Sequence, residues 1–275
     1  MTGKNLFKKV IGTLSMVLAT GGVANAAIYD SGGFEGFINN TDLTGQDPVN
    51  GPWVKAGTNT STATVQSTVT KAGVRAVQMN RAANVNGDAR WAVVKPLPNV
   101  ISPIAVDWDM NYTQSAVPAG SFGPFFGAEA YDSLDNGGAG PLLAGSFGVD
   151  SKTGELLYQQ TVTGFLLPVP GVTVTPGQWN HFRLLANYGT GKYSIYLNGT
   201  LEATEPFVDP NVFDFTDAPI STFAAGGDAA SLAAAGTAYF DNYVVSAVPE
   251  PAIAGFAIVC LSFFSRRTKR QVQSI

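Results

Sequence analysis

Short apolar runs that alternate with polar residues, and that end at glycine or proline, constrain this chain more than any other feature. The 275 residues include 31 glycines and 16 prolines, and both residue types interrupt helices and mark turns. Within residues 104–112, Asp107 and Asp109 fall on one face of an extended segment, and apolar side chains fall on the other. The sequence therefore predicts an all-β fold of short strands.

Turn residues between these runs predict where the strands begin and end. Antiparallel strands of this length, separated by frequent turns, favour a sandwich of two sheets, and the body of the chain suits one domain. A short helical turn is expected at 228–235, where alanines are flanked by glycines. The expected strands are 62–69, 74–79, 90–95, 104–112, 121–131, 142–150, 155–160, 179–187, 192–197 and 237–246.

The first 26 residues are organised as a secretory signal peptide. Three lysines lie among the first nine residues, and the apolar run 10–19 follows them. Ala24 and Ala26 then supply the small residues of an A-x-A cleavage site. We expect cleavage after Ala26 and export of the remaining chain.

The C-terminal tail, 248–275, contains three parts in a fixed order. Pro249, Glu250 and Pro251 come first, and the two prolines prevent a helix or strand from running through them. Residues 252–264 carry no charge and suit a transmembrane helix of about 20 Å, short for a bilayer core of about 30 Å. The basic end favours the cytoplasmic side; it consists of Arg266, Arg267, Lys269 and Arg270.

Taken together, the three parts of the tail resemble the PEP-CTERM sorting signal of exported bacterial proteins. The resemblance implies that an exosortase, a membrane-bound processing enzyme, recognises the tail and cleaves near Pro249–Pro251. It implies a precursor that is tethered transiently to the inner membrane, and a mature protein at the cell surface or in an extracellular matrix rich in polysaccharide. An ordinary C-terminal membrane anchor after a proline-rich stalk is the alternative.

The charge of the exported body limits its partners. Without the two terminal signals, residues 27–251 contain nine basic and twenty acidic residues, a net charge of −11. No basic patch remains, so nucleic acid is not an expected partner. Cys260, the only cysteine, lies in the tail, so the body has no disulfide bond.

Two segments resemble the pattern of concanavalin A-like jelly rolls, including laminin G-like domains. A tryptophan stands within residues 177–183 (GQWNHFR), and residues 193–199 (YSIYLNG) end in Asn-Gly. The resemblance implies a jelly-roll sandwich of two antiparallel sheets over 27–247, with Glu35 and Asp241 where the first and last strands meet. It does not specify an activity, because lectins, hydrolases, lyases and adhesion modules share this fold.

The metal-binding residues expected from this placement are Glu35 and Asp241. Carboxylate oxygens suit Ca²⁺, and with backbone carbonyls these two side chains would hold a structural calcium ion between the terminal strands. The alternative is two acids at the edge of a sandwich. Zinc is not expected, because the body has one histidine and no cysteine.

His181, the only histidine, is one candidate for chemistry. It shares a strand face with Arg183, and Tyr193 or Tyr196 on the next strand can approach it. Polysaccharide lyases with a jelly-roll fold often combine a histidine, a tyrosine and an arginine. The same residue types are also common on a half-exposed strand, so the combination alone does not establish catalysis.

Asp107 and Asp109 lie about 7 Å apart along one strand, a spacing of carboxylates that glycoside hydrolysis uses. Glycosidases with a jelly-roll fold carry Glu-x-Asp-x-Glu or Glu-x-Asp-x-x-Glu, and neither stretch occurs in this sequence. Two aspartates on an exposed strand face are therefore expected.

Aromatic side chains could stack on sugars, but most are expected in the core. They are Trp53, Trp91, Trp108, Trp179 and the cluster 122–126.

We therefore expect an exported, exosortase-processed protein of the cell envelope or extracellular matrix that has no catalytic residues and binds or associates with polysaccharide. Two alternatives remain open. One is a polysaccharide-degrading enzyme, a lyase or a glycoside hydrolase, on the same jelly-roll fold. The other is a module for protein adhesion.

Overall fold

The computed structural model describes residues 26–47, 50–57, 59–85, 87–133 and 140–248. Ala24 of the expected cleavage site and the whole sorting motif, with its apolar run and basic end, lie outside the described residues. Within the described ranges, no helix is both long enough and apolar enough to cross a membrane.

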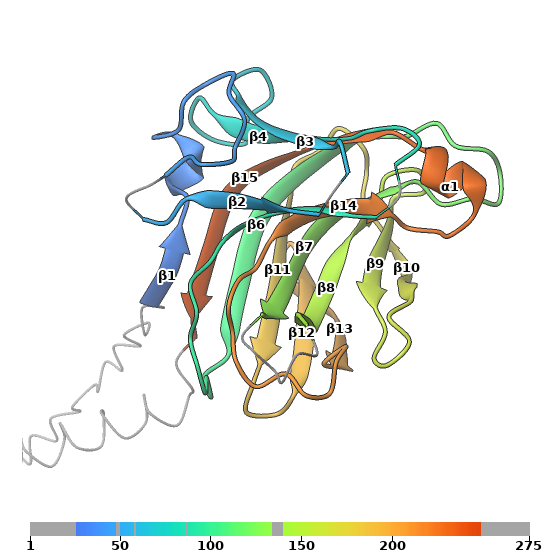
Figure 1. Cartoon of the computed structure of the whole chain (residues 1–275). Coiled ribbons are helices and arrows are strands. Elements are labelled where there is room, and N and C mark those ends of the chain that lie inside the picture. Colours follow the sequence, from blue (N-terminus) through green and yellow to red (C-terminus); the bar gives the residue numbers. More distant parts are fainter. Residues whose placement is uncertain (1–25, 48–49, 58, 86, 134–139, 249–275) are drawn as a thin grey trace, which may run out of the picture.

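Two antiparallel sheets, here called sheet A and sheet B, make up the fold (Figure 1). Sheet A has eight strands in the order β13-β12-β11-β6-β15-β4-β3, with β1 paired to β15. They are β1 (Ala26–Asp30), β3 (Thr62–Gln66), β4 (Ala76–Arg81), β6 (Ile104–Thr113), β11 (Asn180–Asn187), β12 (Lys192–Leu197), β13 (Thr200–Pro206) and β15 (Gly236–Ala247).

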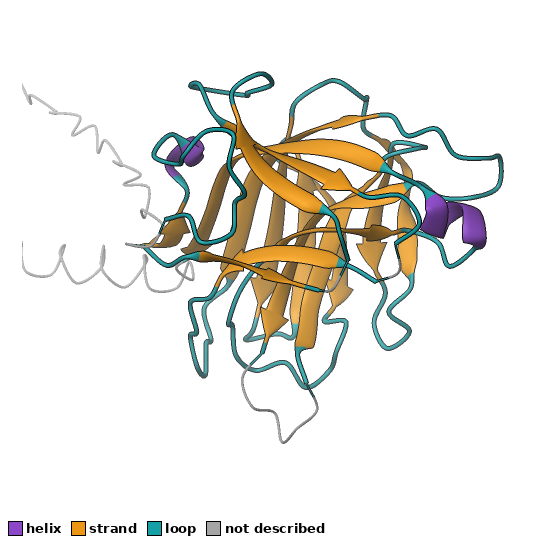
Figure 2. Cartoon of the chain, turned by 45° about the horizontal axis from the view of Figure 1, so that its top comes forward, coloured by secondary structure: helices purple, strands orange, loops and turns teal. Residues whose placement is uncertain are grey.

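Sheet B has seven strands in the order β10-β9-β8-β7-β14-β5-β2. They are β2 (Trp53–Ala56), β5 (Ala89–Val93), β7 (Pro124–Asp132), β8 (Leu142–Asp150), β9 (Glu155–Gln159), β10 (Leu166–Thr173) and β14 (Ile220–Ala224). Two short helices, η1 (Gly32–Phe34) and α1 (Ala229–Ala233), lie at opposite ends of the sandwich (Figure 2).

Aromatic side chains from both sheets fill the space between them. Trp108 of β6 stacks on Phe182 of β11, with ring centroids 5.5 Å apart, and meets Phe147 of β8 edge-on at 5.6 Å. Trp53 and Trp91 are also fully buried. Each such side chain contributes about 1.5–3 kcal/mol of burial, and none of these three tryptophans is available to stack on a sugar.

The predicted all-β fold with two antiparallel sheets is confirmed, and the expected strands are present with small differences at their ends. Five strands were not predicted: β1, β2, β10, β13 and β14. β10 was not predicted because it contains Pro168 and Pro170, and proline is rare within strands. Proline is tolerated there because β10 is the edge strand of sheet B, where one side needs no partner.

The two ends of the domain meet in sheet A. β1 pairs with β15, and Ala26 lies opposite Ala247. The chain therefore enters and leaves the domain at one place. The expected position of Glu35 needs a correction: Asp241 lies on β15, but Glu35 follows β1 at the end of η1 and lies on no strand.

Candidate functional site

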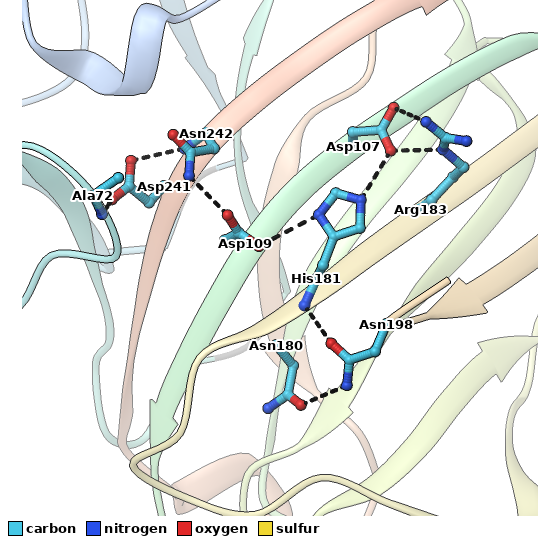
Figure 3. A network of polar contacts seen from close by, with 9 residues as sticks. All are labelled: Ala72, Asp107, Asp109, Asn180, His181, Arg183, Asn198, Asp241 and Asn242. Atoms are coloured by element: carbon cyan, nitrogen blue, oxygen red, sulfur yellow. Dashed lines mark hydrogen bonds and ion pairs between the residues drawn. The ribbon is translucent and has the colours of Figure 1, made fainter. Parts of the chain in front are cut away.

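Each sheet carries a polar cluster on its outer face. On sheet A, side-chain alternation directs Trp108 and Phe182 into the core, and directs Asp107, Asp109, His181 and Arg183 to the other face. The pairing of β6 with β11 sets Asp107 opposite Arg183 and Asp109 opposite His181. Together with Asn242 of β15, these four residues form what we call the His181 cluster (Figure 3).

Hydrogen bonds and ion pairs join every member of the His181 cluster. Arg183 donates through Nε to Asp107 Oδ1 at 2.6 Å and through Nη2 to Oδ2 at 3.2 Å. The two ring nitrogens of His181 lie 3.3 Å from Asp107 Oδ1 and 3.3 Å from Asp109 Oδ1. Asn242 donates to the other oxygen of Asp109 at 2.7 Å. The cluster thus ties β6, β11 and β15 together.

The electrostatics of the cluster oppose a role for His181 as a general base. Hydrogen bonds to Asp107 and then Asp109 raise the pKa of His181 to about 9, although burial acts in the other direction. Burial raises the pKa of each aspartate, but hydrogen bonds, led by those from His181, outweigh it and leave both pKa values lowered. The imidazole is therefore protonated at neutral pH, and both of its nitrogens already contact carboxylates.

Of the two candidate tyrosines, only Tyr196 lies near His181. Tyr193 points into the core, where its hydroxyl donates to the Gln159 carbonyl at 2.5 Å. The expectation that Asp107 and Asp109 are exposed is wrong. They are 8% and 7% exposed, because His181 and Arg183 lie against them.

Glu35 and Asp241 both fasten the turn 71–75 between β3 and β4. Asp241 Oδ2 accepts from two backbone N–H groups of this turn, at 2.9 and 3.1 Å. Glu35 Oε1 accepts from two others, at 2.8 and 3.1 Å. In the part of the chain that the structure describes, no group of three or more His, Cys, Asp or Glu side chains is arranged around a metal site. The calcium site stays a prediction.

The second cluster, which we call the Arg90 cluster, lies on the outer face of sheet B. Arg90 of β5 donates through Nε to Glu129 Oε2 of β7 at 2.7 Å and forms an ion pair with Asp88. Ser221 of β14 donates to Glu129 Oε2 at 2.5 Å, and the Tyr131 hydroxyl donates to Oε1 at 3.1 Å. Arg90 Nη2 also donates to this carboxylate at 3.4 Å, so four donor atoms from three residues hold it.

The members of the Arg90 cluster differ in how far their side chains are exposed to solvent. The side chain of Glu129 is 1% exposed, whereas that of Arg90 is 25% exposed and that of Asp88 is 32% exposed. Burial lowers the pKa of Arg90, but the charge of Glu129 outweighs this effect and keeps the guanidinium protonated. Burial also raises the pKa of Tyr131. The arrangement presents one cation and one carboxylate above a buried anion.

The Arg90 cluster lies at the edge of a hollow of about 400 Å³. Asp88, Arg90 and Glu129 line it on one side, and the β9–β10 hairpin lines it on another. Phe165 of this hairpin is 70% exposed. The amide oxygen of Gln159 is buried beside the hollow and has no hydrogen-bond partner among the described residues. The hollow thus combines charged groups, an exposed aromatic ring and a free acceptor.

The sequence did not single out Arg90 or Glu129, although both lie in predicted strands. A signal was present, since Glu129 is the one charged residue in the apolar run 124–131. A charge that alternation places among apolar neighbours is rarely buried without a partner. The partner itself is on another strand, and local pattern does not identify it.

No known protein family matches the chain, and no curated protein matches it in sequence. Its fold is similar to solved structures. An endo-β-1,4-glucuronan lyase from the fungus Trichoderma reesei shares 13% identity, with a TM-score of 0.50 over 76% of this chain and 94% of that one. The cellulose-induced protein Cip1 shares 19% identity, with a TM-score of 0.50 over 71% of this chain and 91% of that one.

A third similar structure is a sialidase, at 10% identity and a TM-score of 0.50, of which the matched part is 19%. At these identities the similarity shows the fold, which is of the expected jelly-roll type. The expectation of a domain without a catalytic role is nevertheless contradicted, because a glucuronan lyase shares this fold.

Proposed function

We propose that this chain is a polysaccharide lyase that binds a uronic acid-containing chain in the hollow of sheet B. The observation that carries the proposal is the Arg90 cluster, in which the buried Glu129 fixes a partly exposed guanidinium at the edge of a hollow. The shared fold with a glucuronan lyase supports it.

Elimination from a uronate needs a cation and a base. The base removes the proton from the carbon next to the carboxylate, the glycosidic oxygen leaves and takes up a proton, and a carbon–carbon double bond forms without consumption of water. A cation at the carboxylate stabilises the charge that develops there. Arg90 supplies the cation, and Asp88, which contacts Arg90 and is the more exposed of the two carboxylates, accepts the proton.

Phe165 and Phe223 supply the aromatic part of the hollow. Phe223 stacks on Phe125 at 4.4 Å and is held in place, whereas Phe165 is open to solvent. Aromatic faces of this kind bind the apolar face of a sugar ring. We assign Phe165 to the contact with the polysaccharide chain.

A spectrophotometric assay on polyglucuronate and alginate tests the proposal, because elimination produces an ultraviolet-absorbing double bond. We expect the wild-type chain to generate this absorbance and Asp88→Asn to lower the rate at least about 100-fold. Glu202→Gln, a charge change on β13 of the other sheet, is the control. A loss with His181→Ala, together with full activity of Asp88→Asn, would place the chemistry on sheet A instead.

A glycoside hydrolase is the second candidate, and one observation favours it. Asp88 and Glu129 both contact the guanidinium of Arg90, and paired carboxylates are the groups that hydrolyse glycosidic bonds. Reducing ends released without new ultraviolet absorbance would identify a hydrolase and exclude the lyase.

We further propose that the protein is exported and sorted through its two terminal signals. The resemblance of 248–275 to PEP-CTERM tails supports processing by an exosortase and a transient stay at the inner membrane. The pairing of Ala26 with Ala247 is consistent with this route, because the described chain enters and leaves the domain at one place. An extracellular polysaccharide is then the substrate within reach, and Glu35 with Asp241 remain the proposed calcium ligands.

A further inference from the structure

The outer face of sheet A has a hollow of its own, about 200 Å³ in volume, which we call the Arg183 hollow. His181, Arg183, Tyr196 and Gly199 line it. Drug-sized ligands occupy about 300–1,000 Å³, so this hollow suits a single sugar residue and not a long segment of chain. It lies on the sheet opposite the Arg90 cluster.

The charges around this hollow form two layers. Asp107 and Asp109 lie underneath, with side chains 11% and 10% exposed. His181 and Arg183 lie above them, with side chains 44% and 41% exposed. The four charges cancel in sum, but the layer that meets solvent is cationic. In a body with a net charge of −11, this is an unusual surface.

The cations are also fixed in position. Arg183 uses Nε and Nη2 on Asp107, and Nη1 has no hydrogen-bond partner among the described residues. A guanidinium held flat in this way presents its remaining donors to an incoming anion without loss of side-chain freedom. The hydroxyl of Tyr196, a residue that lines the same hollow, likewise makes no hydrogen bond within the described ranges.

We propose that the Arg183 hollow is a second, non-catalytic binding site that takes the carboxylate of one uronic acid residue. Arg183 binds the carboxylate, the charge of His181 adds to the attraction, and Tyr196 donates to a sugar oxygen. A guanidinium can bind a carboxylate with two parallel hydrogen bonds. A polysaccharide bound here stays attached to the protein while the hollow of sheet B is empty.

The histidine provides a specific probe of this site. Because His181 is the only histidine of the chain, its ring protons give a single set of NMR signals. We expect glucuronate added to the full chain to shift these signals, and glucose to leave them unchanged. Unchanged signals with glucuronate at concentrations that saturate the chain in calorimetry would overturn the proposal.

Three variants test which side chains bind. Arg183→Gln should weaken glucuronate binding about tenfold, and Tyr196→Phe about fivefold, as expected for one charged and one neutral hydrogen bond. Lys192 lies outside the hollow on β12, the strand of Tyr196. Lys192→Gln removes this cation and should bind glucuronate as the wild type does. Since Tyr196→Phe removes no hydrogen bond of the fold, wild-type affinity of this variant and of Arg183→Gln would overturn the proposal.

This outcome is separable from that of the lyase proposal. On short oligosaccharides, Arg183→Gln should retain the wild-type rate of elimination, and on long polyglucuronate its KM should rise. If the wild-type chain catalyses no elimination but His181 still responds to glucuronate, the lyase proposal fails and the binding site stands. If elimination is observed and the His181 signals do not respond to glucuronate, the lyase proposal stands and the second binding site fails.

Discussion

Glu129 is 1% exposed, and its Oε2 lies 2.7 Å from Nε of Arg90. Removal of one partner from such a buried pair leaves an uncompensated charge, which costs about 3–5 kcal/mol. We expect Glu129→Ala to lower the free energy of unfolding by this amount, measured by urea denaturation. Asp88→Asn removes the exposed partner of the same guanidinium and should cost less than about 1 kcal/mol. Equal stability of Glu129→Ala and the wild type would contradict a stabilising role of this ion pair.

Phe165 lies at the edge of the hollow in sheet B with its ring 70% exposed. If it stacks on the polysaccharide, Phe165→Ala should raise KM about fivefold and leave the melting temperature unchanged. Phe213, which is 65% exposed and lies outside this hollow, provides a matched control. Kinetics on polyglucuronate measure both variants. A similar KM for the two variants would remove Phe165 from the binding site.

The His181 cluster makes stability depend on pH. The pKa of His181 is raised to about 9 by its hydrogen bonds to Asp107 and Asp109, while the unfolded value is near 6.5. A raised pKa means that the stabilisation is complete below pH 6.5 and is lost as the pH rises through about 9. The side chain is 44% exposed, so after screening by solvent the effect is on the order of 1 kcal/mol.

Urea denaturation between pH 6 and 10 measures this dependence. The wild type should lose stability across the interval from about 6.5 to about 9, and His181→Gln should show a flatter profile. Because the pKa values of Asp107 and Asp109 are lowered, the aspartates act in the opposite window: their stabilisation is present above their ordinary pKa and is lost in acid. Identical profiles of the two proteins above pH 6.5 would contradict the bridging role of His181.

Calcium binding by Glu35 and Asp241 predicts that a chelator lowers the melting temperature of the wild type. Asp241→Asn should melt lower and should not respond to the chelator. These carboxylates also hold the turn 71–75 through backbone N–H groups. If EDTA does not change the melting temperature of the wild type, the calcium proposal fails. The two carboxylates would then serve only to hold the turn.

The sorting proposal predicts that the tail controls release of the body. In a host with an exosortase, Glu250→Ala or deletion of 266–270 should leave the precursor in the membrane. Western blots of membrane and medium fractions measure the result. A conservative change outside the motif, Val272→Ala, is the control. Normal release of the body from both tail variants would contradict processing by an exosortase.

Local pattern predicted much of the fold because the alternation of side chains in a strand depends only on neighbours in the sequence. That rule set Asp107 and Asp109 on one face of their strand with apolar side chains on the other, and His181 on the same face as Arg183, and the structure agrees. It failed for strands without strong alternation. Residues 166–173 contain two prolines, and only their edge position in sheet B makes them a strand.

The candidate sites required the tertiary structure. Arg90 and Glu129 are 39 residues apart, and β14, which contributes Ser221, lies between their strands. The sequence by itself determined the all-β class, the outward faces and the acidic body, since composition and periodicity are local. Strand order and register decided which outward residues meet, which carboxylates are buried and which cation is exposed, because these depend on pairings between distant segments that bury the shared core.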